Sequence, residues 1–456
     1  MRFDAIVVGS GQGGNPLAHK LADAGWSVAL VERADLGGTC INTGCTPTKT
    51  LVHRAAVAHY AREAARWGVR VGEVSVDLAA IVAQKDRIVE SFRDGQRQQV
   101  ERRPNLRLVR AQARFTAPGR LEAAGETLES GKIFLDVGAR PAIPEIPGLA
   151  EAGYLDNAAM LRLTELPEHL VVLGGGYIGM EFAQMFRRFG SRVTVVQRGP
   201  QILPREDPEI AAELQRALEG EGIAFRLDAR TTGVSKGSGG LRVALEESAG
   251  RSTLDGSHLL VATGRTPNGD TLDLARAGVE TDRRGYIRVN ERLETTAPGV
   301  WALGDANGGP AFTHISYNDY QIIYGNLVEG RDLSTKGRLV PYCVFTDPQL
   351  GGVGMTEAEA RKAGRKLKIG RIPMTRVARA VERDETAGLL KLVVDAADDR
   401  ILGASLLCSE GGELVQILVP LMRAGLPYTA LKGAVFIHPT LAEGFFALME
   451  DVKPVD

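Results

Sequence analysis

A glycine-rich turn near the start of the chain constrains the fold more than any other feature of the sequence. The apolar residues 5–8 predict a buried strand, the turn follows at residues 9–14, and a helical pattern comes next. A second strand at residues 27–31 ends at Glu32. This order is typical of a dinucleotide-binding fold, in which the acid accepts from a ribose hydroxyl and the glycines approach a pyrophosphate. The glycines in question are Gly9, Gly11 and Gly14. The alternative is a glycine turn without a ligand, which the complete context disfavours.

The same order recurs in the middle of the chain. Residues 170–173 predict a strand, a second Gly-x-Gly-x-x-Gly turn follows, and residues 192–196 predict the next strand. The glycines of this turn are Gly174, Gly176 and Gly179. The two turns lie too far apart for a solenoid repeat, so we expect two separate dinucleotide folds.

The second fold lacks the acid of the first. Its second strand ends in Gln197 and Arg198, and Arg205 follows shortly after. The 2′-phosphate of NADPH is negatively charged, and a site with arginines and without the acid suits it. We therefore expect NADPH to be preferred over NADH. The alternative is that Arg198 points into solvent.

Length and composition predict a globular protein without a nucleic-acid or membrane partner. A chain of 456 residues suggests about three domains. The formal net charge of −1 gives no basic field that would attract nucleic acid or an anionic membrane. No apolar run reaches the length of a membrane span, and the first residues lack a signal-peptide core. We therefore expect a cytoplasmic protein.

Two of the four cysteines, Cys40 and Cys45, lie in the glycine-rich stretch GGTCINTGCTPTK. In a regular helix, Cα atoms at this spacing lie roughly 8–9 Å apart, whereas a disulfide needs less than about 7 Å. A bond between them requires a distorted turn, for which Gly44 supplies the backbone freedom. The spacing alone leaves open the alternative of two reduced, unpaired cysteines.

A regular helix is expected after this stretch. Thr46 is the predicted cap, and Pro47 suits the first turn. We expect residues 44–47 to depart from regular helix. The thiols would then lie near a helix N-terminus with Lys49 close by, which favours a thiolate.

The last third of the chain changes character. From about Arg338 onward, strand-like segments predict an antiparallel α+β domain. Cys343 and Cys408 lie in or beside such strands, so we expect buried structural thiols. His438 precedes a predicted proline-started helix in which Glu443 could orient the imidazole, although a lone histidine there is more often structural.

Asp305 ends a predicted strand in a Gly-Asp pair. Its carboxylate could bond a cofactor hydroxyl or cap the helix that starts near Pro310. The sequence leaves these two roles evenly matched.

The complete set of motifs resembles the pyridine nucleotide–disulfide oxidoreductases. Besides the two glycine turns and the cysteine stretch, the resemblance rests on Ala262-Thr263-Gly264, Gly304-Asp305 and His438-Pro439-Thr440 with Glu443. It runs over essentially the whole chain in the order of the family. That family includes dihydrolipoamide dehydrogenase, glutathione reductase and mercuric reductase.

The resemblance implies an α/β fold with two Rossmann-like domains, for FAD and NAD(P), and a C-terminal α+β dimerisation domain. It places the FAD-binding domain at residues 1–147 and 269–337. The NAD(P)-binding domain would span residues 148–268, and the dimerisation domain residues 338–456.

The resemblance also implies the cofactor contacts. The residues that would hold FAD include Gly9, Gly11, Gly14, Glu32 and Asp305. Those that would hold NADPH, or NADH as the alternative, include Gly174, Gly176, Gly179 and Arg198. Gly38, Thr39 and Gly264 complete the cofactor-binding set.

The implied reaction passes electrons from NADPH through the flavin to a Cys40–Cys45 disulfide. Cys45 would lie nearest the flavin and Cys40 would face the substrate. Lys49 would pair with Glu181 near the flavin ring. His438, supplied by the other subunit of a homodimer and oriented by Glu443, would move protons to and from Cys40 and its partner.

Within the family, the chain is most similar to mercuric reductases and their copper-reducing relatives. We expect it to differ from a true mercuric reductase in lacking the vicinal cysteine pair near the C-terminus and the metal-capture domain, and it has His438 where that enzyme has tyrosine. We therefore expect reduction of a disulfide or a soft metal ion. The alternatives are a dihydrolipoamide-dehydrogenase or glutathione-reductase type of small-disulfide reductase and, more remotely, a non-catalytic redox-sensing flavoprotein dimer.

Overall fold

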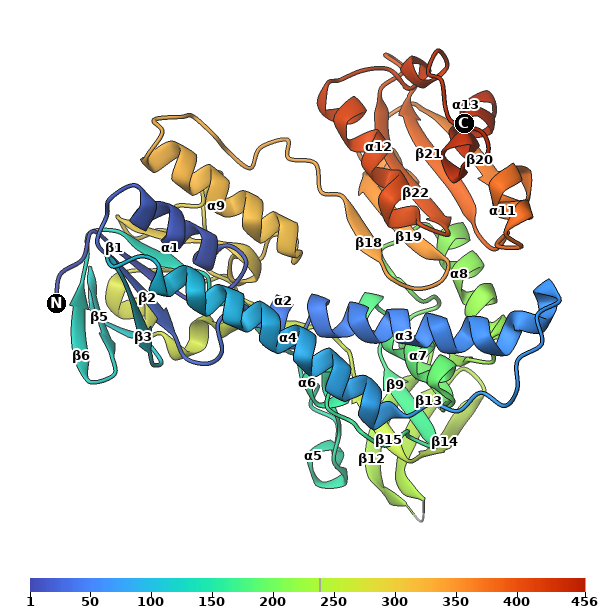
Figure 1. The fold of residues 1–456 in the computed structure, drawn as a ribbon, viewed down its shortest axis with the longest axis horizontal. Helices are drawn as coiled ribbons and strands as arrows, with labels where there is room; N and C mark the ends of the chain where they lie inside the picture. The colour runs from blue at the N-terminus through green and yellow to red at the C-terminus, as the bar shows by residue number, and fades with distance from the viewer. Residues whose placement is uncertain (238, 456) are drawn as a thin grey trace.

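The computed structural model describes residues 1–237 and 239–455, which form three bodies around a central cavity. Figure 1 shows the first body at the left, built from the blue N-terminal segments and the gold segment that contains α9. The green second body lies at the lower right, and the red C-terminal body lies above it. The long helix α3 runs from the centre of the molecule between the second and third bodies.

The first body is a parallel dinucleotide-binding sheet. Its strand order is β17-β7-β1-β2-β3, and every neighbouring pair is parallel. The strands are β1 (Ala5–Val8), β2 (Val28–Glu32), β3 (Leu106–Arg110), β7 (Ile133–Leu135) and β17 (Val300–Ala302). The helices are α1 (Gly14–Asp23), α2 (Gly38–Asn42), α3 (Cys45–Glu63), α4 (Leu78–Glu101) and α9 (Thr313–Leu327). Because β17 comes after the entire second body in sequence, the sheet closes only when a distant part of the chain returns to it.

Small antiparallel elements accompany this sheet. One three-stranded sheet joins β4 (Arg114–Ala117), β5 (Arg120–Ala123) and β6 (Glu126–Glu129). A two-stranded sheet joins β8 (Ala139–Pro141) and β16 (Arg265–Pro267), the two segments at which the chain leaves and re-joins the first body.

The second body repeats the parallel arrangement, with strand order β11-β10-β9-β15. The strands are β9 (His169–Leu173), β10 (Arg192–Val196), β11 (Ala224–Arg226) and β15 (His258–Val261). The helices are α5 (Leu149–Ala152), α6 (Asn157–Met160), α7 (Tyr177–Phe189) and α8 (Pro208–Gly220). An antiparallel sheet of β12 (Arg230–Gly237), β13 (Gly240–Glu247) and β14 (Gly250–Gly256) is attached to it. The two expected dinucleotide folds are therefore both present.

The third body is an antiparallel six-stranded sheet covered by helices, as the sequence predicts. Its order is β18-β19-β22-β21-β20-β23. The strands are β18 (Tyr342–Val344), β19 (Gln349–Gly354), β20 (Leu367–Pro373), β21 (Leu389–Asp395), β22 (Ile401–Cys408) and β23 (Lys453–Val455). The helices are α10 (Glu357–Lys362), α11 (Ala378–Glu382), α12 (Gly411–Arg423) and α13 (Gly444–Glu450). The limits of the domains along the chain stay a prediction.

None of the helices in the described ranges is long and apolar enough to cross a membrane. The cytoplasmic location stays a prediction.

Candidate active site

A cavity of about 2230 Å³ lies where the three bodies meet. Its wall includes both glycine turns, the cysteine stretch and part of β18. Typical small-molecule pockets measure about 300–1,000 Å³, so this cavity has room for more than one large ligand. The resemblance-based expectation of two dinucleotides fits its size.

Cys40 and Cys45 lie on two successive helices that meet at a sharp break. Cys40 is in α2, Cys45 is the first residue of α3, and both sulfurs are unbridged. Gly44 caps α3 with φ −130° and ψ −116°, and a Cβ there would lie 2.8 Å from the Thr39 carbonyl oxygen. The expected departure of residues 44–47 from regular helix is present at Gly44 but is wrong for residues 45–47, which form the first turn of α3. A side chain at position 44 would collide with the preceding turn, so this break requires glycine.

Two details of this turn differ from the sequence-based expectation. Gly44 occupies the cap position assigned to Thr46, so that assignment is wrong. Thr46 instead lies inside the first turn, where its carbonyl oxygen accepts a hydrogen bond from the Thr50 hydroxyl at 2.8 Å. Pro47 does lie in the first turn, where a missing N–H costs no intrahelical bond.

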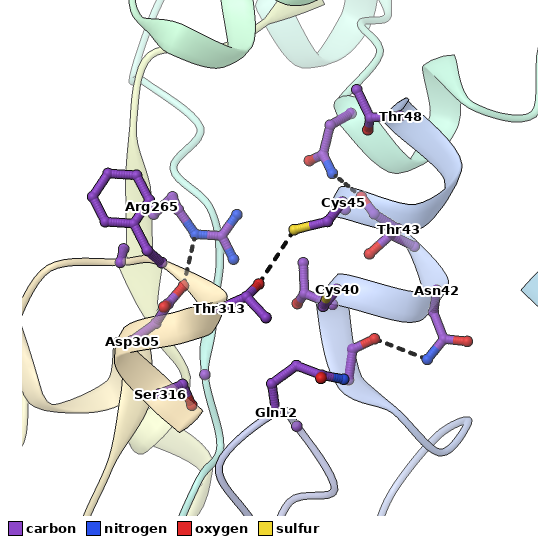
Figure 2. A pocket seen from close by; sticks show the side chains of 18 of the residues that line it. Gln12, Cys40, Asn42, Thr43, Cys45, Thr48, Arg265, Asp305, Thr313 and Ser316 are labelled. Atoms are coloured by element: carbon purple, nitrogen blue, oxygen red, sulfur yellow. Dashed lines mark hydrogen bonds and ion pairs between the residues drawn. The ribbon is translucent and has the colours of Figure 1, made fainter. Parts of the chain in front are cut away.

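The Thr313 hydroxyl lies against the Cys45 sulfur (Figure 2), at 3.3 Å between Oγ1 and Sγ. A hydrogen bond from Cys40 is the largest cause that lowers the pKa of Cys45 to about 6; Thr313 and the Lys49 charge add to it, against burial. The pKa of Cys40 is raised, because its proton is held by Cys45 and because it is partly buried. In the reduced pair, Cys45 is therefore the thiolate and Cys40 the thiol.

Lys49 and Glu181 form the expected ion pair across two bodies. Lys49 Nζ lies 2.5 Å from Glu181 Oε2, and the ammonium lies 4.6 Å from the centre of the Phe345 ring. The other oxygen of Glu181 accepts from the Phe345 N–H at 3.0 Å. The glutamate, on α7, is buried and ties α3 to the segment that follows β18. It is not a solvated helix residue.

The first glycine turn has the close backbone contacts of a dinucleotide cradle. Gly9 has φ +100°, and a Cβ on Gly14 would lie 2.2 Å from the Gly9 carbonyl oxygen. Glu32 lines the cavity and accepts hydrogen bonds from the Ser10 N–H at 2.9 Å and the Ser10 hydroxyl at 2.7 Å. These features fit the FAD that the resemblance implies.

The remaining residues expected around FAD also line the cavity, namely Gly11, Gly38, Thr39 and Asp305. Asp305 lies in a short 3₁₀ turn, 3.4 Å from the Arg265 guanidinium (Figure 2), and burial raises the pKa of its carboxyl. It does not cap α9, which begins at Thr313 after Phe312. The capping role is therefore wrong, and the contact with a cofactor stays a prediction that agrees with its place on the cavity wall.

The second glycine turn has the same close packing. Gly174 has φ +108°, and a Cβ on Gly179 would lie 2.1 Å from the Gly174 carbonyl oxygen. Gly176 and Gly264 line the cavity. The Gln197 amide oxygen accepts from the Gly175 N–H at 3.0 Å, so this side chain is bound to the turn itself.

The two arginines expected to select NADPH are placed differently. Arg198 is exposed and is not part of the cavity wall as described, whereas Arg205 is part of it. The assignment of Arg198 to the cofactor contact stays a prediction, and Arg205 is the better placed of the two.

A column of stacked rings lies on the cavity wall and was not expected from the sequence. Tyr177 stacks on Tyr342 at 5.7 Å, Tyr342 on Phe312 at 5.9 Å, and Phe312 on His314 at 5.4 Å. Both tyrosine hydroxyls donate to the buried Glu206, at 2.6 Å from Tyr177 and 2.8 Å from Tyr342. No local pattern marks these residues as neighbours, because the column draws on all three bodies.

Cys343 was expected to be buried with Cys408, and this is wrong for Cys343. Cys408 is fully buried, but Cys343 is half-buried and lines the cavity. Burial raises the pKa of Cys343 to about 12, so this thiol stays protonated.

His438 lies away from the cysteines of its own chain. Its side chain is 72% exposed, and its Nδ1 lies 3.1 Å from Glu443, as expected. The predicted proline-started helix is wrong. Thr440 precedes a short 3₁₀ turn, and α13 begins only at Gly444. Within the part of the chain that the structure describes, His438 does not line the cavity.

Comparison with known proteins matches most of the chain to two family models. The family model described as pyridine nucleotide-disulphide oxidoreductase matches residues 3–319, and its dimerisation-domain model matches residues 340–448. RclA of Escherichia coli, named a probable pyridine nucleotide-disulfide oxidoreductase, is 38% identical over 99% of this chain and all of its own. A dihydrolipoyl dehydrogenase of Thermus scotoductus is 36% identical over 98% of this chain and 97% of its own. A mercuric reductase of Lysinibacillus sphaericus is 33% identical over 97% of this chain and 81% of its own.

Solved structures agree with these matches. The structure of RclA, described as an HOCl-induced flavoprotein disulfide reductase, has a TM-score of 0.90 and covers 99% of this chain and 100% of its own. A second solved structure, a Cu(II) complex of RclA, has the same TM-score and coverage at 38% identity.

Proposed function

The chain belongs to the pyridine nucleotide–disulfide oxidoreductase family, and from that premise we propose that it passes electrons from NADPH to a small disulfide or a soft metal ion through FAD and the Cys40–Cys45 pair. One observation carries this proposal. The Cys45 sulfur lies in the cavity wall between the two glycine turns, next to a hydroxyl donor and near the Lys49–Glu181 pair.

FAD, when bound, supplies the two-electron chemistry that links the nicotinamide to the cysteines. The residues proposed to hold it are those of the first cradle, Gly9, Gly11, Gly14, Glu32 and Asp305, together with Gly38 and Thr39. Lys49, fixed by Glu181, adds a positive charge to the cavity wall beside Cys45. That charge favours both the Cys45 thiolate and an electron-rich ligand.

The cysteines carry the electrons out of the cavity. Oxidation of the Cys40 thiol and the Cys45 thiolate forms one S–S bond, releases one proton and delivers two electrons. A small disulfide takes both electrons and the released proton and is cleaved to one thiol and one thiolate, whereas two Cu(II) ions take one electron each and leave as Cu(I). Thiolates are soft ligands that suit Cu(I), and a related protein is known as a Cu(II) complex, so we propose Cu(II) as the metal acceptor.

Of these two acceptor classes, the small disulfide is the one that His438 and Glu443 favour. An imidazole held by a carboxylate can protonate a leaving thiolate, a step that metal reduction does not need. Because His438 lies away from the cavity of its own chain, we propose that it serves the partner subunit of a homodimer.

The test is a steady-state panel. NADPH and NADH are each assayed with lipoamide, oxidised glutathione, Hg(II), Cu(II), quinones and oxygen, and kcat/KM is compared. We expect one disulfide or metal acceptor to exceed the others, with turnover lost in Cys45→Ser. Full turnover of every acceptor by Cys45→Ser would exclude the dithiol route. Arg205→Ala should narrow a preference for NADPH more than Arg198→Ala does, and higher kcat/KM with NADH would overturn that preference.

A further inference from the structure

A buried carboxyl group lies directly behind the first glycine turn. Asp136 follows β7, and its side chain is 6% exposed. We propose that Asp136 makes FAD binding depend on a proton, so that the neutral acid admits FAD and the carboxylate opposes it. The inference rests on the FAD binding that family membership establishes, and it concerns a residue that the family motifs described above do not include.

The carboxyl group occupies the N-terminus of α1. Asp136 Oδ2 accepts the Gly14 N–H at 2.7 Å, and a Cβ on Gly11 would lie 2.6 Å from the same oxygen. In a dinucleotide fold these backbone groups and the positive end of the helix dipole face the pyrophosphate. Asp136 and the phosphates of FAD therefore compete for the same backbone N–H donors.

The charged groups around Asp136 do not neutralise it. Asp305, from the 3₁₀ turn after β17, and Asp319, on α9, are the nearby charges, and both are acidic. Arg265 lies beside Asp305 and Arg338 beside Asp319, so each cation already has its own carboxylate. Within residues 1–237 and 239–455, no lysine or arginine lies within ion-pair distance of Asp136.

The other elements packed on Asp136 contribute neutral groups. The turn itself offers the N–H groups of Gly13 and Gly14, and α9 offers the Ser316 hydroxyl, 3.5 Å from Oδ1. Glu32, at the end of β2, is a further acid in the same cradle, and its oxygens accept from Ser10 and Ala34. An ionised Asp136 would thus be stabilised only by two N–H donors and one hydroxyl, while the neighbouring acids and the incoming phosphates repel it.

The protonated side chain carries no negative charge, so the repulsion from the neighbouring acids and from the phosphates is absent. Its carbonyl oxygen keeps the Gly14 bond, and its hydroxyl can donate to Ser316, as the amide of an asparagine would. Burial raises the pKa of Asp136 to about 8, against the bonds from Gly14 and Gly13. The neutral form therefore prevails at neutral pH, and the carboxylate appears as the pH rises through about 8.

The sign of the effect follows from linkage. FAD binds the protonated form more tightly, so the affinity of the protein for FAD is highest below this pKa. The affinity falls as the pH rises through the pKa. Above that point the Kd should rise by about tenfold per pH unit, as for one linked proton.

The experiment titrates FAD-free protein with FAD from about pH 6 to about pH 9.5 and reads the Kd from flavin fluorescence. The wild type should show the alkaline rise in Kd, and Asp136→Asn should bind with a flat profile. Glu73→Gln, which changes an exposed acid outside the cavity wall, should behave as the wild type. A flat wild-type profile, or an unchanged slope in Asp136→Asn, would overturn the proposal.

Calorimetry provides a test that needs no variant. Titrations of wild-type protein with FAD near pH 8.5, in two buffers of different ionisation enthalpy, should reveal uptake of about three quarters of a proton per FAD bound, which is the ionised fraction of Asp136 half a pH unit above its pKa. Uptake indistinguishable from zero would overturn the proposal even if Asp136→Asn failed to fold.

Discussion

Thr313 is the residue whose hydroxyl reaches the Cys45 sulfur, from the first turn of α9. Thr313→Val keeps the shape of the side chain and removes this donor. A hydrogen bond to a charged group is worth about 1.5–3 kcal/mol, so the pKa of Cys45 should rise from about 6 by at least about one pH unit. The measurement is the rate at which Cys45 of the reduced protein is alkylated as a function of pH, with the modified residue identified by peptide mass mapping.

Thr313→Ser is the matched control, because it keeps a hydroxyl at the same position. Its alkylation profile should stay near that of the wild type. If the pH profile of alkylation shifted equally in the serine and valine variants, packing rather than the hydroxyl would set the pKa of Cys45.

At the scale of elements, Lys391 joins the third body to the second. Its ammonium, on β21, is almost fully buried and lies 2.7 Å from Asp207, 2.5 Å from Glu209 and 2.8 Å from Glu357. The first two carboxylates begin α8 and the third begins α10. The three acids lie close enough together to hold a metal ion, but the lysine already occupies their centre.

Removing this cation should destabilise the protein strongly. Lys391→Met leaves the buried Asp207 carboxylate without its cation, a loss of about 3–5 kcal/mol for a buried pair. Unfolding in urea, followed by tryptophan fluorescence, should show a lower midpoint. Lys453→Met, which removes an exposed pair with Asp451, should change stability by less than about 1 kcal/mol. Equal midpoints for the two variants would contradict the assignment.

The same cluster predicts a pH dependence. Burial would raise the pKa of Glu357, but hydrogen bonds from Lys391 and Arg361 lower it to about 2. Its stabilising contribution is therefore complete above about pH 4.5 and is lost as the pH falls through about 2. The difference in urea midpoint between the wild type and Lys391→Met should narrow over that range.

At the scale of the whole molecule, the proposed site is complete only in a dimer. His438 sits in a loop where Val435 is 97% exposed and Ile437 78% exposed, away from its own cysteines. A mixed dimer of a Cys45→Ser subunit and a His438→Ala subunit should recover close to half the disulfide-reductase activity. One of its two sites then combines intact cysteines with an intact histidine from the other subunit.

The opposite pairing is the control. A wild-type subunit paired with a Cys45→Ser, His438→Ala double mutant should have little activity, because its intact cysteines face the altered histidine. If each chain used its own His438, the two mixed dimers would show the reverse result.

The sequence by itself determined the elements and their order. Both glycine turns, the strands around them, the break at Gly44 and the antiparallel third body follow from local patterns, because glycine freedom and hydrophobic period act over a few residues. The pair of His438 with Glu443 was expected from their spacing and the pair of Lys49 with Glu181 from family resemblance, and both are present. Local signals failed at boundaries, as with Thr46 and Pro439, where neighbouring backbone contacts decide which residue starts a helix.

Only the tertiary structure decided which distant side chains meet. Thr313 lies 268 residues from Cys45 in sequence, and Asp136 lies 122 residues from the turn that it contacts. No period or spacing encodes such contacts, since they arise from how three bodies pack around one cavity. Burial then sets the chemistry of these side chains. In sequence, Asp136 resembles any surface acid, but the fold removes its carboxyl group from water and surrounds it with other acids, which raises its pKa.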